Sequence, residues 1–134
     1  MIYNEPDIPL YIEKVAAQVM DLALLIHRER GPGLLEKGYE FCLYHDLVDL
    51  GFFVRSQVYL PITHNNHKLN QAYRVDLIVN DCLVVEIKAI EGPILPIHKS
   101  QVLSYLKAGG YRLGLIINFN TQYLKDGIKR VIAR

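Results

Sequence analysis

The chain has 134 residues, of which 51% are hydrophobic and 22% are charged. Its 15 basic and 14 acidic side chains leave a formal net charge of +1. This length and composition are typical of one globular domain, and we expect residues 1–134 to form it. The near-neutral balance excludes the strongly basic, histone-like class of nucleic-acid binders but is compatible with a local basic patch.

Cysteine spacing and apolar segments exclude further classes of protein. Cys42 and Cys82 lie in apolar stretches without CxxC spacing, which excludes a zinc framework and a disulfide-dense secreted scaffold. No segment approaches the ~18 apolar residues that cross a bilayer. The first residues lack the basic-then-apolar order of a signal peptide. We therefore expect a cytoplasmic protein that does not bind membranes.

Two helices are predicted in the first 50 residues. Apolar residues recur at helical spacing from Pro9 to Arg30, and Gly31-Pro32-Gly33 ends that pattern. A second helix is predicted for residues 34–50, where Gly51 stops it. Its buried side is expected to consist of Leu35, Tyr39, Cys42, Leu43 and Leu47.

Beyond Gly51 the pattern changes to short strands. Strands are predicted at residues 52–62, 72–79 and 83–90, a helix at 97–108, a strand at 112–118, and a short turn or helix at 123–132. The order ααβββαβ predicts an α/β (α+β) fold with a four-stranded mixed sheet flanked by helices. The last strand is expected to lie parallel to the third, after a right-handed crossover.

Two acidic residues interrupt strands that are otherwise apolar. Asp76 lies within YRVDLIV and Glu86 within CLVVEIKAI. A charged group in a central strand costs free energy unless it is paired or binds a metal. Because side chains alternate along a strand, Lys88 lies on the same face as Glu86.

The turn between these strands decides whether Asp76 shares that face. A two-residue loop would put Asp76 on the opposite face from Glu86. A three-residue loop, 80–82, would pair Val79 with Leu83 and therefore Asp76 with Glu86. We predict the three-residue loop or an equivalent bulge.

Facing carboxylates predict a cation between them. Asp76 and Glu86, ~5 Å apart at Cβ, would repel each other. Mg²⁺ binds one or two carboxylates together with waters and a substrate phosphate. Lys88 would then contact a scissile phosphate or orient the attacking water. A buried ion-pair network of the same three residues, without a catalytic role, is the open alternative.

Several segments besides this triplet carry a family resemblance. Residues 33–39, GLLEKGY, match the pattern GxxExxY as they stand. Together with YRVDLIV, LVVEIKAI, QVLSYL and GLIINFN, they resemble the GxxExxY protein family of the PD-(D/E)XK nuclease superfamily, from about Ala16 to Arg130. One departure is that Val75, not proline, precedes Asp76.

The resemblance implies a restriction-endonuclease-like core and metal-assisted phosphodiester hydrolysis. It implies that Asp76, Glu86 and the carbonyl of Ile87 hold Mg²⁺ or Mn²⁺, and that Lys88 is the catalytic lysine.

The same resemblance assigns roles to helical residues. Glu36 would lie near the metal, Gln101 would anchor the site, and Tyr105 would hydrogen-bond a phosphate. Gln101 and Tyr105 are four residues apart and share one helix face. The plainer alternatives are a first-turn glutamate that favours the helix N-terminus and ordinary packing of the third helix on the sheet. Candidates for further phosphate contacts are Arg55, Arg74, His98, Lys99 and Lys107.

Two functions follow from the sequence. The first is a divalent-metal-dependent nuclease whose partner is nucleic acid, DNA rather than RNA. The alternative is a catalytically silent module that keeps the fold and binds nucleic acid or a protein. The surplus of apolar residues also predicts a homodimer.

Overall fold

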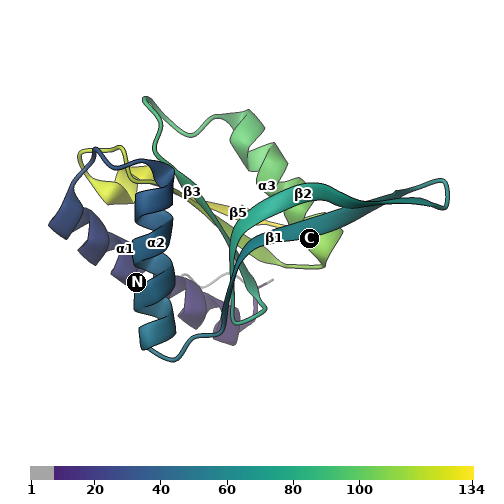
Figure 1. Ribbon diagram of the computed structural model, residues 1–134, viewed down its shortest axis with the longest axis horizontal. Helices are drawn as coiled ribbons and strands as arrows, with labels where there is room; N and C mark the ends of the chain where they lie inside the picture. Colours follow the sequence, from purple (N-terminus) through teal and green to yellow (C-terminus); the bar gives the residue numbers. More distant parts are fainter. Residues whose placement is uncertain (1–7) are drawn as a thin grey trace.

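The computed structural model describes residues 8–134 and places helices on both faces of a five-stranded sheet (Figure 1). In chain order the elements are α1 (Leu10–Arg30), α2 (Glu36–Asp49), β1 (Val54–His64), β2 (His67–Val79), β3 (Leu83–Lys88), α3 (Pro96–Gly109), β4 (Leu113–Asn118), a 3₁₀ turn η1 (Leu124–Gly127) and β5 (Ile128–Ile132). The mixed α/β fold expected from the sequence is therefore confirmed.

The sheet has the spatial order β1-β2-β3-β4-β5. Only β3 and β4 are parallel, as predicted, and the other neighbours are antiparallel. The expectation of four strands is wrong, because residues 128–132 form a fifth strand in place of a turn or helix. β5 pairs with the free edge of β4, whose backbone groups would otherwise lack ladder partners.

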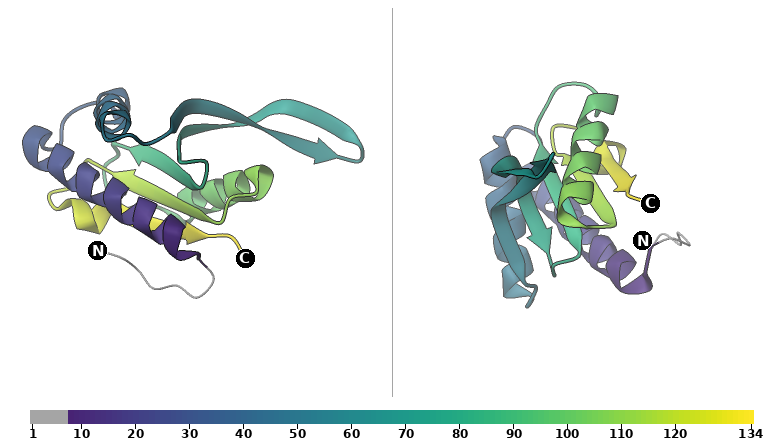
Figure 2. Two further views of the ribbon diagram at one scale, coloured as in Figure 1. Left: turned by 90° about the horizontal axis from the view of Figure 1, so that it is seen from below. Right: turned by 90° about the vertical axis from the view of Figure 1, so that its right-hand side faces the viewer.

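The β1–β2 hairpin is longer than the sequence predicted. Its strands reach His64 and His67, so most of the stretch interpreted as a polar turn is paired. Only Asn65 and Asn66 form the tip, with φ of 48° and 67°; asparagine tolerates this left-handed conformation well. The hairpin projects well beyond the helices, as Figure 2 shows.

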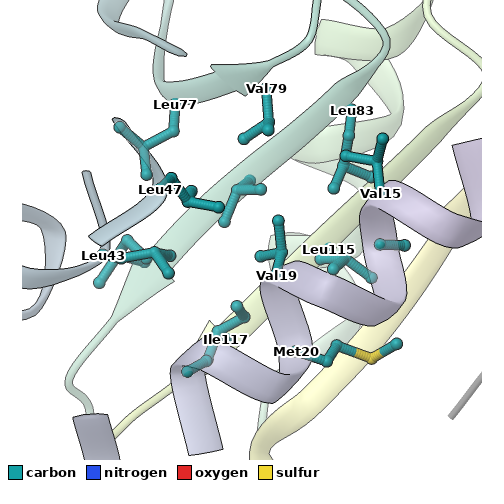
Figure 3. Close-up of a cluster of buried hydrophobic side chains, with 14 of the residues drawn as sticks. Val15, Val19, Met20, Leu43, Leu47, Leu77, Val79, Leu83, Leu115 and Ile117 are labelled. Carbon is teal, nitrogen blue, oxygen red and sulfur yellow. The ribbon is translucent and has the colours of Figure 1, made fainter. Parts of the chain in front are cut away.

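Two hydrophobic clusters cover opposite faces of the sheet. The larger one packs α1 and α2 on β2, β3 and β4, and Figure 3 shows side chains from all five elements within it. The smaller one packs α3 on the other face. Residues of β3 alternate between them: Leu83, Val85 and Ile87 face α1 and α2, whereas Val84 faces α3. This alternation confirms the faces predicted for β3.

α2 departs from its prediction at one position. Tyr39, Leu43 and Leu47 are fully buried as expected, and Cys42 is partly buried. Leu35 is 82% exposed because it precedes the helix as its N-cap and does not belong to the buried stripe. Within residues 8–134 no helix is both long enough and apolar enough to cross a bilayer.

α3 is packed unusually close to the sheet. A Cβ atom added at Gly114 of β4 would lie 2.8 Å from the Val102 side chain of α3. Glycine at this position lets the helix approach the strand. The close approach brings the α3 face that carries Tyr105 against the sheet.

Candidate active site

The β2–β3 register is the one predicted from the three-residue loop. Val79 pairs with Leu83, and the ladder continues to Leu77 opposite Val85. Asn80 and Asp81 take φ of 50° and 53°, which closes the turn. The next positions along this register are Asp76 and Glu86, so the two acids face each other across neighbouring strands.

Side-chain hydrogen bonds replace the ladder at this point. The backbone N–H of Asp76 donates to Glu86 Oε1 at 2.9 Å, and the backbone N–H of Ile87 donates to Asp76 Oδ2 at 2.8 Å. Each carboxylate therefore holds the other strand in place. Within residues 8–134, Glu86 Oε2 accepts no hydrogen bond from the chain and is free to bind a ligand.

Strand alternation breaks at Asp76. Val75 and Ile78 both pack in the α3 cluster, whereas Leu77 packs in the cluster under α1 and α2. Opposite Asp76, Gln57 of β1 has a φ of 52°, a left-handed conformation that is uncommon for a residue with a side chain. This irregularity turns the Asp76 side chain into a cavity beside α2.

Of the carboxylates in the site, Glu86 has the pKa that burial raises closest to neutral pH. It is 6% exposed, and burial raises its pKa to about 8, with a further rise from the neighbouring Asp76 carboxylate. The Asp76 N–H and the Lys88 ammonium oppose that rise, while Glu36 adds to it. Burial is the main cause of the raised pKa, and the Lys88 ammonium does not offset burial and the neighbouring carboxylates together.

Lys88 stands at the end of β3, half-buried and beside Glu86. Within residues 8–134 its ammonium group makes no hydrogen bond or ion pair. Its carbonyl accepts a hydrogen bond from Phe119 N–H at 2.9 Å. The buried amide of Asn118 bonds the backbone of Ile90 and Gly92, which fixes the loop after β3. The strand end that carries Lys88 is therefore rigid.

The loop before α2 is held by Tyr39. Its hydroxyl donates to the Gly31 carbonyl and accepts from Leu34 N–H, and its ring stacks on Phe119 with centroids 4.3 Å apart. These contacts fix the start of α2, where Glu36 lines the cavity. The pattern GxxExxY thus has a physical explanation, since its tyrosine positions its glutamate.

Glu40 and Gln57 are site residues that the sequence analysis missed. Gln57 Nε2 donates to Glu40 Oε1 at 2.8 Å and lies 3.5 Å from Asp76 Oδ1. Burial raises the pKa of Glu40, and the Asp76 carboxylate raises it further, while the Gln57 amide lowers it. A sequence signal existed for Glu40, because it follows Glu36 by four residues and shares its helix face.

The two α3 candidates differ in their positions. Tyr105 is 5% exposed and packs on Tyr73, with ring centroids 5.4 Å apart. Burial raises the pKa of Tyr105 to about 12, with further rises from the Glu86 and Asp76 carboxylates, so its ring lies near both acids. Gln101 is exposed and lies in a separate shallow pocket with Tyr73. Tyr105 therefore lies near the carboxylates, whereas Gln101 lines a different pocket from the one that Asp76 lines.

The cavity beside Asp76 has a volume of about 740 Å³. It lies between α2 and the β1–β2 hairpin. Its lining residues are Glu36, Lys37, Glu40, Phe41, Tyr44, His45, Ser56, Gln57, Arg74 and Asp76. Of the predicted phosphate contacts, Arg74 therefore faces this cavity, whereas Arg55 pairs with Asp81 at 2.8 Å. The site thus combines carboxylates, two cations and a group of aromatic rings.

The donor atoms suit a hard divalent cation. In the part of the chain that the structure describes, no group of three or more His, Cys, Asp or Glu side chains could hold a metal ion. Asp76 and Glu86 nevertheless supply two carboxylates. The Ile87 carbonyl points to the same strand edge as its N–H, which bonds Asp76. Two carboxylates, a carbonyl and waters make an all-oxygen set of the kind that Mg²⁺ and Mn²⁺ take.

Comparison with known proteins supplies one match. The family model described as PD-(D/E)XK nuclease superfamily matches residues 13–131. No curated protein and no solved structure matches the chain. The matched range contains both carboxylates, Lys88 and all of α2 and α3.

Proposed function

The chain belongs to the PD-(D/E)XK nuclease superfamily, and we propose that it hydrolyses phosphodiester bonds in nucleic acid, DNA rather than RNA, with a divalent cation. The observation that carries this proposal is the buried Glu86 facing the partly buried Asp76, with Lys88 beside them. A buried acid with a strongly raised pKa next to a second acid is typical of a functional site.

Asp76, Glu86 and the Ile87 carbonyl would hold the cation, which is Mg²⁺ or Mn²⁺ in our proposal. When bound, such an ion polarises a phosphate oxygen and lowers the pKa of a water. It would also neutralise the charge that raises the pKa of Glu86.

The chain's own groups would orient the substrate. The Lys88 ammonium would contact the scissile phosphate or the attacking water, and its rigid strand end keeps it in position. Tyr105 would hydrogen-bond a phosphate oxygen through its hydroxyl, which is protonated at neutral pH, since burial raises its pKa to about 12. Glu36 would orient water from the start of α2. Gln101, which is exposed on α3, would anchor the site by contacting bound substrate.

We also propose that, within this superfamily, the chain is a member of the GxxExxY family. Its support is the motif at residues 33–39, in which Tyr39 fixes the loop before Glu36. The homodimer and the cytoplasmic location expected from the sequence also stay predictions. Light scattering tests the homodimer through the molar mass in solution.

Cleavage assays test the proposal directly. We expect Mg²⁺- or Mn²⁺-dependent cleavage of DNA, with single-stranded, duplex and branched substrates and RNA compared side by side. Glu86→Ala and Lys88→Ala should each reduce the rate by about 10³-fold or more. Glu91→Ala, an exposed acid near the end of β3, is the matched control and should keep the rate. Cleavage that survives both site variants would overturn the proposal.

The second candidate is a catalytically silent module of the same fold. The net charge of +1 and the lack of a third side-chain ligand within residues 8–134 favour it. Calorimetric titration separates the two functions. Binding of Mg²⁺ or Mn²⁺ that Glu86→Gln abolishes supports the nuclease, and no binding at millimolar concentration supports the silent module.

A further inference from the structure

A stripe of side chains on α2 faces the cavity beside Asp76. Its first part is charged, with Glu36, Lys37 and Glu40, and its second part is aromatic, with Phe41, Tyr44 and His45. These positions repeat at the spacing of one helix face. Phe41 and His45 are exposed and have no role in the core or in the proposed chemistry, whereas Tyr44 between them packs partly against the core.

The aromatic residues form a connected group at the cavity wall. The rings of Phe41 and His45 have centroids 4.5 Å apart, and those of Tyr44 and His45 are 5.1 Å apart. Phe41 is 65% exposed, so the fold leaves most of its ring uncovered. An exposed aromatic ring beside a charged cavity is typical of a binding surface rather than of a core.

The distance along the helix matches the dimensions of a polynucleotide. Phe41 and His45 lie one to five residues beyond Glu40, which is about 1.5–7.5 Å along the helix axis. Neighbouring bases in a strand are about 3.4 Å apart. A base on the aromatic group would therefore lie about one or two nucleotides from a phosphate near Glu40, which Gln57 links to Asp76. Lys37 and Arg74 line the same cavity and supply positive charge for a phosphate backbone.

We infer that the ring group Phe41, Tyr44 and His45 stacks an unpaired nucleobase of the DNA substrate. This inference rests on the proposed function, which it narrows to single-stranded or locally unpaired DNA. Stacking on an aromatic ring needs an open base face, and both faces of a base inside a duplex are already stacked. Aromatic stacking tolerates every base, so the group favours unpaired structure without selecting a sequence.

Binding of a fluorescent oligonucleotide tests the inference independently of cleavage. The probe is a short single strand containing 2-aminopurine, whose emission falls when it stacks, compared with the same sequence as a blunt duplex. Lys88→Ala serves as the background, since it removes the proposed catalytic ammonium. We expect tighter binding of the single strand, with quenching, and a loss of about 10-fold in affinity for Phe41→Ala or His45→Ala.

The matched control is Phe53→Ala. Phe53 is 59% exposed, but it lies outside the cavity. Its removal should leave affinity and quenching unchanged, and the melting temperature of each variant checks the fold. Equal affinity for single strand and duplex, or unchanged affinity and quenching in Phe41→Ala, would overturn the inference. So would a Phe41→Ala variant that changes only the molar mass in solution, because the rings would then contact a second copy.

The two proposals fail in different ways. Absence of metal-dependent cleavage by the unsubstituted chain, with retained base stacking, would overturn the nuclease and keep the binding surface. Cleavage of duplex DNA that is insensitive to Phe41→Ala would keep the nuclease and overturn the stacking site.

Discussion

Two buried glutamates of this molecule differ in how their charge is balanced. Glu13 of α1 is 2% exposed, and both its oxygens accept hydrogen bonds from the Arg130 guanidinium of β5, each at 2.9 Å. Glu86 of β3 is 6% exposed and faces Asp76. The first acid has a bidentate cationic partner within the chain, and the second has another acid in front of it.

The difference shows which buried charge serves the fold and which is available to a ligand. A buried carboxylate costs several kcal/mol unless it is paired with good geometry. The Glu13–Arg130 pair meets that requirement and ties the first helix to the last strand. Among residues 8–134, Glu86 has no such cationic partner, so burial and the neighbouring Asp76 carboxylate raise its pKa to about 8. A cation from solution would supply what Arg130 supplies to Glu13.

The largest expected effect comes from breaking the paired acid. Glu13→Ala should lower the free energy of unfolding by about 3–5 kcal/mol, because it removes the bidentate, buried ion pair with the Arg130 guanidinium, whose side chain is 12% exposed. Urea denaturation at pH 7 measures this loss. Glu29→Ala, an exposed acid of the same helix, is the control and should change stability by less than about 0.5 kcal/mol. A loss below about 1 kcal/mol for Glu13→Ala would show that the Arg130 pair does not stabilise Glu13 as proposed, and that the contrast with Glu86 is wrong.

The unpaired acid should show its effect in the pH dependence of stability. Glu86 titrates near 4.5 when unfolded and near 8 when folded. Between these values the folded chain holds the extra proton, so the free energy of unfolding falls as pH rises, by at most about 1.4 kcal/mol per pH unit. We expect Glu86→Gln to be more stable than the unsubstituted chain by roughly 4 kcal/mol at pH 8 and nearly equal to it near pH 4.5.

Denaturation curves from pH 5 to pH 8, without divalent ions, measure that slope. Glu91→Gln, an exposed acid three residues after Lys88, is the control and should keep it. A Glu86→Gln variant with the same slope as the unsubstituted chain would contradict the assignment of the raised pKa to Glu86.

The smallest expected effect is stabilisation by the cation itself. At ~10 mM Mg²⁺ and a Kd of about 1 mM, binding to the folded chain adds about 1.4 kcal/mol. The increment should be larger at pH 8 than at pH 5, because Glu86 must lose its proton to bind the ion. Thermal unfolding with and without Mg²⁺, at constant ionic strength, measures it. An equal increment in Glu86→Gln would place the ion elsewhere.

Local rules predicted the centre of the site. The three-residue loop after Val79 implies the register that brings Asp76 to Glu86, and the structure has that register. Strand alternation also predicted that Glu86 and Ile87 lie on opposite faces of the sheet, and Ile87 packs in the cluster under α1 and α2. These features depend on residues within about a dozen positions of one another, so turn length and side-chain period suffice to predict them.

Other features depend on how distant elements dock. Glu40 reaches the site only because α2 packs against β1, where Gln57 bridges it to Asp76. Residues 128–132 form a strand because β4 has a free edge beside them. The family resemblance paired Gln101 with Tyr105 on one helix face, but in the fold Tyr105 is buried near the carboxylates while Gln101 is exposed in another pocket. No local pattern carries this information, since it comes from contacts between segments far apart in the chain.

The sequence by itself determined the mixed α/β fold, the facing acids on β2 and β3, and the lysine that follows them. Periodicity and turn length act within one or two elements, which is why they were sufficient. Only the tertiary structure decided which buried acid received a cationic partner. Arg130 reached Glu13 across 117 positions of chain, while the Asp76–Glu86 pair kept its unbalanced charge beside a cavity lined by α2. Charge balance in a folded protein depends on long-range packing, which is why the sequence alone did not reveal the difference between Glu13 and Glu86.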